Sequence, residues 1–184
     1  MFHELFGKQP IIVSLDIDSH IEQTIAQLYQ SGLQAIELLK SNRVLLAKLK
    51  QKFPNIKIGL GNILNVTELT AAYEDGFDFM SSPGFYAPLV QTANIYQISY
   101  LPGICNMSDA INALSLQIHH ARPCPGNLEL CNLLNKYTPQ IKLYPMDVAW
   151  GEIEQLLDLP SVAAVGLSNP DQLQIIQITE SIQV

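Results

Sequence analysis

Four residues have side chains that could do chemistry in a chain otherwise rich in apolar runs: Glu37, His120, Arg122 and Asp147. A carboxylate can act as a general acid or base, and a histidine changes its charge near neutral pH. An arginine can hold a carboxylate or a phosphate through two parallel hydrogen bonds. His120 and Arg122 are two residues apart, so in a strand both point to the same face. These residues offer proton transfer and anion binding, with an internal Glu37–Arg122 salt bridge as the plainer alternative.

The chain around these residues alternates short apolar runs with longer amphipathic ones. We predict strands at 11–15, 35–39, 57–60, 77–80, 98–101, 117–121, 141–144 and 163–165. We predict helices at 18–29, 44–52, 65–76, 87–93, 108–114, 128–135, 151–157 and 171–182. Strict alternation predicts an α/β protein with a parallel sheet covered by helices, and eight units favour a compact (β/α)8 (TIM) barrel over an open sheet. We also expect a short N-terminal helix at 2–8 against the bottom of the barrel.

The composition fits one domain over residues 1–184, with short loops, because such a barrel typically takes about 250 residues. Hydrophobic residues make up 48% of the chain and charged ones 15%, which predicts a large core. The net charge is −7 and no segment is basic, so we expect no nucleic-acid partner. Apolar stretches are too short for a membrane span, and the first residues lack the order of a signal peptide. The 3 cysteines are not spaced as metal ligands, which predicts a reduced, cytoplasmic protein.

Four short motifs stand near the ends of the predicted strands: I-E-L-L at 36–39, G-L-G-N-I-L-N at 59–65, S-P-G at 82–84 and L-P-G at 101–103. Their order and spacing resemble those of the 2-keto-3-deoxy-6-phosphogluconate (KDPG) and 4-hydroxy-2-oxoglutarate (KHG) aldolases. That family has L-E-V-T, G-A-G-T-V-L-N, S-P-G and L-P-G at the corresponding places. No single motif is specific, but the four together identify the chain as a divergent member of the family.

The resemblance implies a carbon–carbon lyase that acts on 2-keto acids and releases pyruvate, in a barrel that forms homotrimers. It implies a small 2-keto acid or other small anion as the ligand, and neither a cofactor nor a bound metal. It assigns general acid/base catalysis to Glu37. It also implies substrate-binding roles for residues at the strand ends, namely Asn62, Pro83, Gly84, Arg122, Gly166 and Ser168.

The Schiff-base lysine of the family is missing. Members carry it in K-F-F-P, and alignment on the proline gives H-A-R-P at 120–123, with His120 at the lysine position. Histidine has no primary amine, so it cannot form the iminium that the class I mechanism needs. We therefore expect weak, altered or absent aldolase activity, with Glu37 and His120 as the catalytic candidates. Lys40 is an alternative amine, although its strand parity is opposite to that of Glu37.

Two other functions stay open. The phosphate-binding T-G-G-I of the family becomes M-D-V-A at 146–149, so Asp147 would place negative charge beside a phosphate, and we expect no tight binding of phosphorylated sugar acids. Loss of the lysine and of these glycines together is compatible with a non-catalytic anion-binding or scaffold barrel. Alternatively, Glu37, His120 and Asp147 converge on a divalent metal that replaces the lysine as electrophile, or they are three independent polar residues at the barrel mouth.

Overall fold

The protein is described here from a computed structural model, which defines the backbone of residues 10–182 and side chains up to residue 178. The strands are β1 (Ile11–Leu15), β2 (Ala35–Leu38), β3 (Lys57–Leu60), β4 (Phe79–Ser81), β5 (Tyr100–Leu101), β6 (Gly103–Ile104), β7 (His120–Pro123), β8 (Lys142–Leu143) and β9 (Val165–Ser168). The helices are α2 (Ile21–Gln30), α3 (Arg43–Lys52), α4 (Val66–Asp75), α5 (Ala87–Tyr96), α6 (Met107–Ser115), α7 (Leu128–Tyr137), α8 (Ile153–Leu157) and α9 (Gln172–Ile182), with a 3-10 turn, η1 (Trp150–Glu152), before α8. The helix expected at 2–8 lies outside the described residues.

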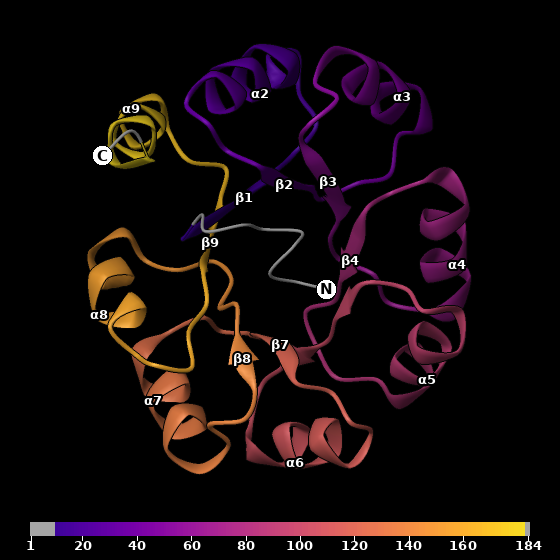
Figure 1. Ribbon diagram of the computed structural model, residues 1–184, viewed down its shortest axis with the longest axis vertical. Coiled ribbons are helices and arrows are strands. Elements are labelled where there is room, and N and C mark those ends of the chain that lie inside the picture. Colours follow the sequence, from indigo (N-terminus) through magenta and orange to yellow (C-terminus); the bar gives the residue numbers. More distant parts are fainter. Residues whose placement is uncertain (1–9, 183–184) are drawn as a thin grey trace.

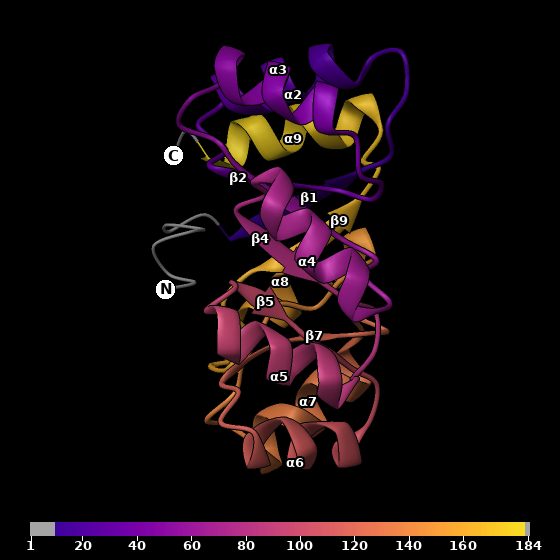
Figure 2. The same ribbon diagram turned by 90° about the vertical axis from the view of Figure 1, so that its right-hand side faces the viewer.

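All strand pairs are parallel, and the helices follow in chain order around the outside of the strands (Figure 1). One sheet has the order β5-β4-β3-β2-β1-β9 and the other has the order β6-β7-β8. Pro102 separates β5, which pairs with β4, from β6, which pairs with β7. Two backbone hydrogen bonds also join β8 to the segment before β9, from Leu143 N to Ser161 O at 2.8 Å and from Ala163 N to Leu143 O at 2.9 Å. The described chain is thus an α/β fold with a curled parallel sheet inside a layer of helices (Figure 2).

Asparagine side chains start four of the helices. Each accepts a hydrogen bond from the backbone N–H three residues further on, which satisfies a donor that the helix leaves unpaired. These caps are Asn42, Asn65, Asn106 and Asn127. The predicted helices are confirmed to within three residues at each end. For the first helix, the sequence predicts Asp18 or Ser19 as the cap, and this is wrong, because His20 takes that position and makes no side-chain cap.

The predicted strands of the second half of the chain need correction. The strand expected at 117–121 is His120–Pro123, and the one expected at 163–165 is Val165–Ser168. The observed strand includes Pro123, although proline has no N–H to donate. Its neighbours donate instead, since Arg122 N bonds Pro102 O at 2.9 Å and Cys124 N bonds Ile104 O at 3.0 Å. His120 therefore begins its strand, whereas the prediction places it near the end.

The inner face of the sheet has an apolar layer and then a polar one. The apolar layer contains Ile12, Ala35, Phe79, Leu101, Tyr144 and Ala164. Side chains two residues apart in a strand point the same way, so the next inward residues after Ile12, Ala35 and Phe79 are Ser14, Glu37 and Ser81. All three are fully buried. The fold therefore places a set of polar groups one layer nearer to the C-terminal ends of the strands, where barrels carry their active sites.

Candidate functional site

The polar layer centres on a buried ion pair between β2 and β7. Glu37 and Arg122 are both 0% exposed, and Arg122 Nη1 donates to Glu37 Oε1 at 2.5 Å. Ser81 Oγ donates to the same carboxylate oxygen at 2.5 Å and accepts from Arg122 Nη1 at 3.0 Å. Ser14 Oγ donates to the other oxygen, Oε2, at 2.8 Å. The salt bridge offered as the plainer reading of the sequence is thus present.

Glycines make room for this pair. A Cβ atom added to Gly61, which follows β3, would lie 2.9 Å from the Glu37 carboxylate. A Cβ atom added to Gly166 of β9 would lie 2.9 Å from Arg122 Nη2. Such approaches are closer than carbon can make without displacing the side chain that it meets. Any side chain at either position would therefore push the ion pair out of place.

One edge of the Arg122 guanidinium has no partner. Within the described residues, Nε and Nη2 are buried and make no hydrogen bond. These two nitrogens point along the same edge, which is the geometry that binds a carboxylate or phosphate through two parallel hydrogen bonds. A buried donor without a partner costs about 1–3 kcal/mol. The structure therefore has an unpaired anion-binding edge next to Glu37.

His120 lies apart from this group. It is the first residue of β7, at the opposite end of the strand from the barrel's usual active-site edge. Its Nδ1 is 3.2 Å from the Tyr144 hydroxyl, and burial lowers its pKa. Burial likewise raises the pKa of Tyr144 to about 12. The two candidate catalytic residues, Glu37 and His120, are thus in different layers of the interior.

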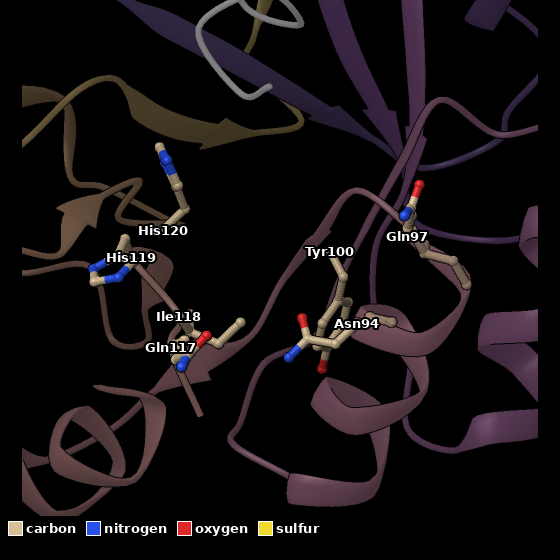
Figure 3. A pocket seen from close by; sticks show the side chains of 9 residues that line it. Asn94, Gln97, Tyr100, Gln117, Ile118, His119 and His120 are labelled. Atoms are coloured by element: carbon tan, nitrogen blue, oxygen red, sulfur yellow. The ribbon is translucent and has the colours of Figure 1, made fainter. Parts of the chain in front are cut away.

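A pocket of about 390 Å³ adjoins His120 (Figure 3). Its walls come from the end of α5 and the start of β5 on one side, and from residues 117–120 on the other. These are the segments on either side of the break that Pro102 makes in the sheet. Asn94 and Tyr100 face Gln117 and Ile118 across the gap. The pocket therefore lies at the N-terminal edge of the strands, away from Glu37.

The predicted substrate-binding residues lie on several loops. Asn62 follows β3, is exposed and has φ +58°. Pro83 and Gly84 follow β4, and their backbone packs so closely on Gly103 that an added Cβ there would lie 2.3 Å from both. Ser168 ends β9 and donates its Oγ hydrogen to Asp147 Oδ1. These residues belong to the same strand-end edge as Arg122 and Gly166.

The metal alternative needs correction. Among the described residues, no three or more histidine, cysteine, aspartate or glutamate side chains lie close enough together to hold a metal ion. Glu37 is tied to Arg122, His120 contacts Tyr144, and Asp147 accepts from Ser168. The three residues do not converge, because β7 starts at His120 and so turns that side chain to the far end of the interior.

No lysine of residues 10–178 is buried. Lys40 is exposed beyond the end of β2, and Lys142 Nζ donates to Pro160 O at 3.0 Å. The remaining ones lie on helices or at strand starts. The described interior therefore offers a guanidinium beside Glu37 and no primary amine.

The sequence places Ser81 at a strand end without a role and gives no signal at Ser14 that we use, although both serines hold the Glu37 carboxylate. Such residues can be found in a sequence as serines inside an apolar strand, an even number of positions from a residue whose side chain points inward. Ser14 in I-I-V-S-L is the clear example. A polar residue at such a position needs a polar partner, because burying a hydroxyl without one is unfavourable.

The described chain is a curled parallel sheet inside a layer of helices, with a buried polar group near the C-terminal ends of its strands. The model of the family described as KDPG and KHG aldolase matches residues 6–183. The chain therefore belongs to the KDPG and KHG aldolase family.

Individual relatives agree with this assignment. A 2-dehydro-3-deoxy-phosphogluconate aldolase of Zymomonas mobilis is 27% identical over 164 residues, which is 85% of this chain and 78% of the relative. The crystal structure of the 2-keto-3-deoxy-6-phosphogluconate aldolase of Zymomonas mobilis has a TM-score of 0.83 at 24% identity, over 98% of this chain and 93% of that one. A KDPG aldolase of Legionella pneumophila, with pyruvate captured as a covalent carbinolamine, has a TM-score of 0.84 at 22% identity, over 97% of this chain and 95% of that one.

None of the described helices is long and apolar enough to cross a membrane.

Proposed function

We propose that this protein binds a small 2-keto acid, or a similar small carboxylate, without forming a Schiff base. The observation that carries this proposal is the unpaired edge of Arg122 beside Glu37. Family relatives are aldolases of keto acids, and a guanidinium holds a carboxylate well but cannot attack a ketone. In the carbon–carbon lyase reaction of the family, the protein is therefore inactive or weak. Its role is that of a non-catalytic binding barrel.

A second alignment supports the proposal. The chain has two prolines in R-P-C-P at 122–125, and alignment of K-F-F-P on Pro125 puts Arg122 at the lysine position in place of His120. Arg122 meets Glu37, the carboxylate that resembles the family's general acid/base, whereas His120 does not. On this alignment the reactive amine is replaced by a permanent cation.

The hydrogen bonds of Glu37 fix the position of Arg122. The two carboxylate oxygens accept from Arg122, Ser81 and Ser14. The carboxylate thus holds the guanidinium in place for a ligand. Because Arg122 is fully buried, ligand entry requires the groups above it to move aside.

Reductive trapping with pyruvate tests the proposal. The wild-type protein is incubated with pyruvate and sodium borohydride, and its intact mass is measured beside an active aldolase as positive control. An iminium on any lysine would be reduced to a stable adduct. We expect none. A pyruvate adduct on the wild-type protein would refute the loss of Schiff-base chemistry.

Two variants separate the alignments. Arg122→Lys places a primary amine beside Glu37, so we expect it to gain a pyruvate adduct. His120→Lys places the amine at the other end of β7, where we expect none. An adduct on His120→Lys but not on Arg122→Lys would restore the first alignment.

The proposal has three further parts, which are the closure of the barrel, the oligomeric state and the cellular compartment. The hydrogen bonds between Leu143 and residues 161–163 support closure of the sheet into a full (β/α)8 barrel formed by one domain over residues 1–184. The family resemblance supports a homotrimer, which light scattering of the purified protein tests. The free cysteines Cys105, Cys124 and Cys131 are compatible with a reduced cytoplasmic environment.

A further inference from the structure

A chain of polar side chains runs along the strand-end rim beside Arg122. We call Asp147, Ser168, Asn169 and Asp16 the acidic rim. Ser168 donates to the Asp147 carboxylate, and Asn169 Nδ2 donates to Asp16 Oδ2 at 2.9 Å. The Asp16 backbone N–H donates to Asn169 Oδ1 at 2.7 Å. The rim thus consists of two hydrogen-bonded pairs, which the peptide bond between Ser168 and Asn169 connects.

The backbone at this rim is in an unusual conformation. Asp147 has φ +54° and Asn169 has φ +45°, in the left-handed region that glycine adopts most easily. Aspartate and asparagine adopt this region more readily than other residues with a Cβ atom, because their short polar side chains can hydrogen-bond locally. Asp147 thus sets a carboxylate where a glycine would leave bare backbone.

The rim carries negative charge near the unpaired edge of Arg122. Within residues 10–178, neither Asp16 nor Asp147 forms a salt bridge. A Cβ atom added to Gly166 would lie 2.9 Å from Arg122 Nη2, and Gly166 is two residues before Ser168 on β9. The pKa of Cys124, two residues after Arg122, is raised by burial and further by the Asp147 charge. Strand β9 thus connects the unpaired edge of Arg122, at Gly166, with the acidic rim, at Ser168.

We propose that the acidic rim selects a ligand whose far end carries hydroxyl groups and no anion. This inference rests on the proposed binding of a 2-keto acid at Arg122, and it narrows the ligand to an unphosphorylated polyhydroxy 2-keto acid. In TIM barrels, a phosphate is bound by backbone N–H groups of the loops that follow the last two strands of the barrel. Here the Asp147 carboxylate takes the Ser168 hydroxyl hydrogen that a phosphate oxygen would take, and it repels a second anion. Sugar hydroxyls can donate to the same carboxylate.

Calorimetric titration of three ligands tests this selection. The ligands are pyruvate, 2-keto-3-deoxygluconate and its 6-phosphate, and the proteins are the wild type, Asp147→Gly and Glu74→Gln. Glycine fits the left-handed backbone, so Asp147→Gly removes the charge without strain. Glu74→Gln removes one exposed charge on α4 and is the matched control. Since a like-charge contact costs several kcal/mol, we expect the wild type to bind the phosphate ester at least about tenfold more weakly than the unphosphorylated acid.

Asp147→Gly is expected to gain about tenfold or more for the ester and to leave pyruvate binding unchanged, whereas Glu74→Gln changes neither. Equal wild-type affinity for the ester and the unphosphorylated acid would overturn the selection. Titration with inorganic phosphate is a further measurement, which does not depend on binding of a carboxylate at Arg122. If pyruvate binds no protein but phosphate binds only Asp147→Gly, the proposed function fails and the exclusion of phosphate by the rim stands. If pyruvate binds and Asp147→Gly gains nothing, the rim inference alone fails.

Discussion

At the scale of single residues, Glu37 and Arg122 depend on one another. Each is a buried charge whose partner is the other. Removal of one member of such a pair leaves an uncompensated charge in the interior and typically costs 3–5 kcal/mol. The pair is therefore a stability element of the molecule as well as a candidate ligand site.

We expect Glu37→Gln to lower the free energy of unfolding by about 3 kcal/mol, because Arg122 then stays buried without a counter-charge. Urea denaturation measures the change. Ser14→Ala is the matched control, since it removes one hydrogen bond to the same carboxylate but no charge, and we expect a loss of about 1 kcal/mol. A double variant, Glu37→Leu with Arg122→Met, is expected to recover most of the stability. Equal losses for Glu37→Gln and Ser14→Ala would contradict the view that charge pairing dominates.

The sequence predicts which residue types form the site, but it places the His120 side chain at the wrong end of the strand. Glu37 stands out as a charge inside an apolar run, and its salt bridge to Arg122 is one of the alternatives that the sequence leaves open. His120 has the same parity as Arg122, but the predicted strand begins three residues too early, which puts His120 near the mouth. Which proline of R-P-C-P aligns with the family motif depends on where β7 begins, and hydrogen bonds to β6 decide that.

At the scale of elements, helix ends differ in the residue that turns the chain. After α2 and α4 the left-handed position is glycine, with φ +96° at Gly32 and +90° at Gly76. After α5 and α6 it is glutamine, with φ +54° at Gln97 and +60° at Gln117. Glycine ends a helix in this conformation without the steric cost that a Cβ atom brings. Both glutamine positions line the pocket beside His120.

We expect Gln97→Gly to stabilise the protein by about 1 kcal/mol, because it removes the left-handed strain at the end of α5. The midpoint of thermal unfolding reports the change. Gln91→Gly, in the exposed interior of the same helix, is the control with the opposite sign, and it should cost about 1 kcal/mol. A loss of stability in both variants would show that the Gln97 side chain makes contacts that outweigh the strain.

Most helices and strands of the structure can be predicted from the sequence. Helix ranges follow from amphipathic runs and from asparagine caps such as Asn65. Several strand boundaries in the second half do not follow, because short strands of two residues, such as Gly103–Ile104, are set by pairing with their neighbours and carry no pattern of their own. The break at Pro102 is marked in the sequence by the proline, but the partner that each half-strand takes is a property of the assembled sheet.

At the scale of the whole molecule, the fold is that of the KDPG and KHG aldolase family, over almost the entire chain. The chemistry of a family lies in a few side chains on such a scaffold, and the scaffold persists when they change. Here the described interior holds a carboxylate in contact with a guanidinium, and no lysine of residues 10–178 is buried. Likeness of the whole chain is therefore compatible with the proposed loss of the reaction.

The ion pair also has a consequence for how the molecule folds. Glu37 belongs to the six-stranded sheet and Arg122 to the three-stranded one, so their bond crosses the interior between the two sheets and links residues 85 positions apart. Because this contact requires both sheets to be in place, we expect it to form after the rate-limiting barrier to folding. Weakening a late contact leaves the folding rate nearly unchanged and speeds unfolding, so folding and unfolding kinetics of Glu37→Gln test this expectation. On that account, the residue that we align with the reactive lysine of the family sets how long the native state lasts.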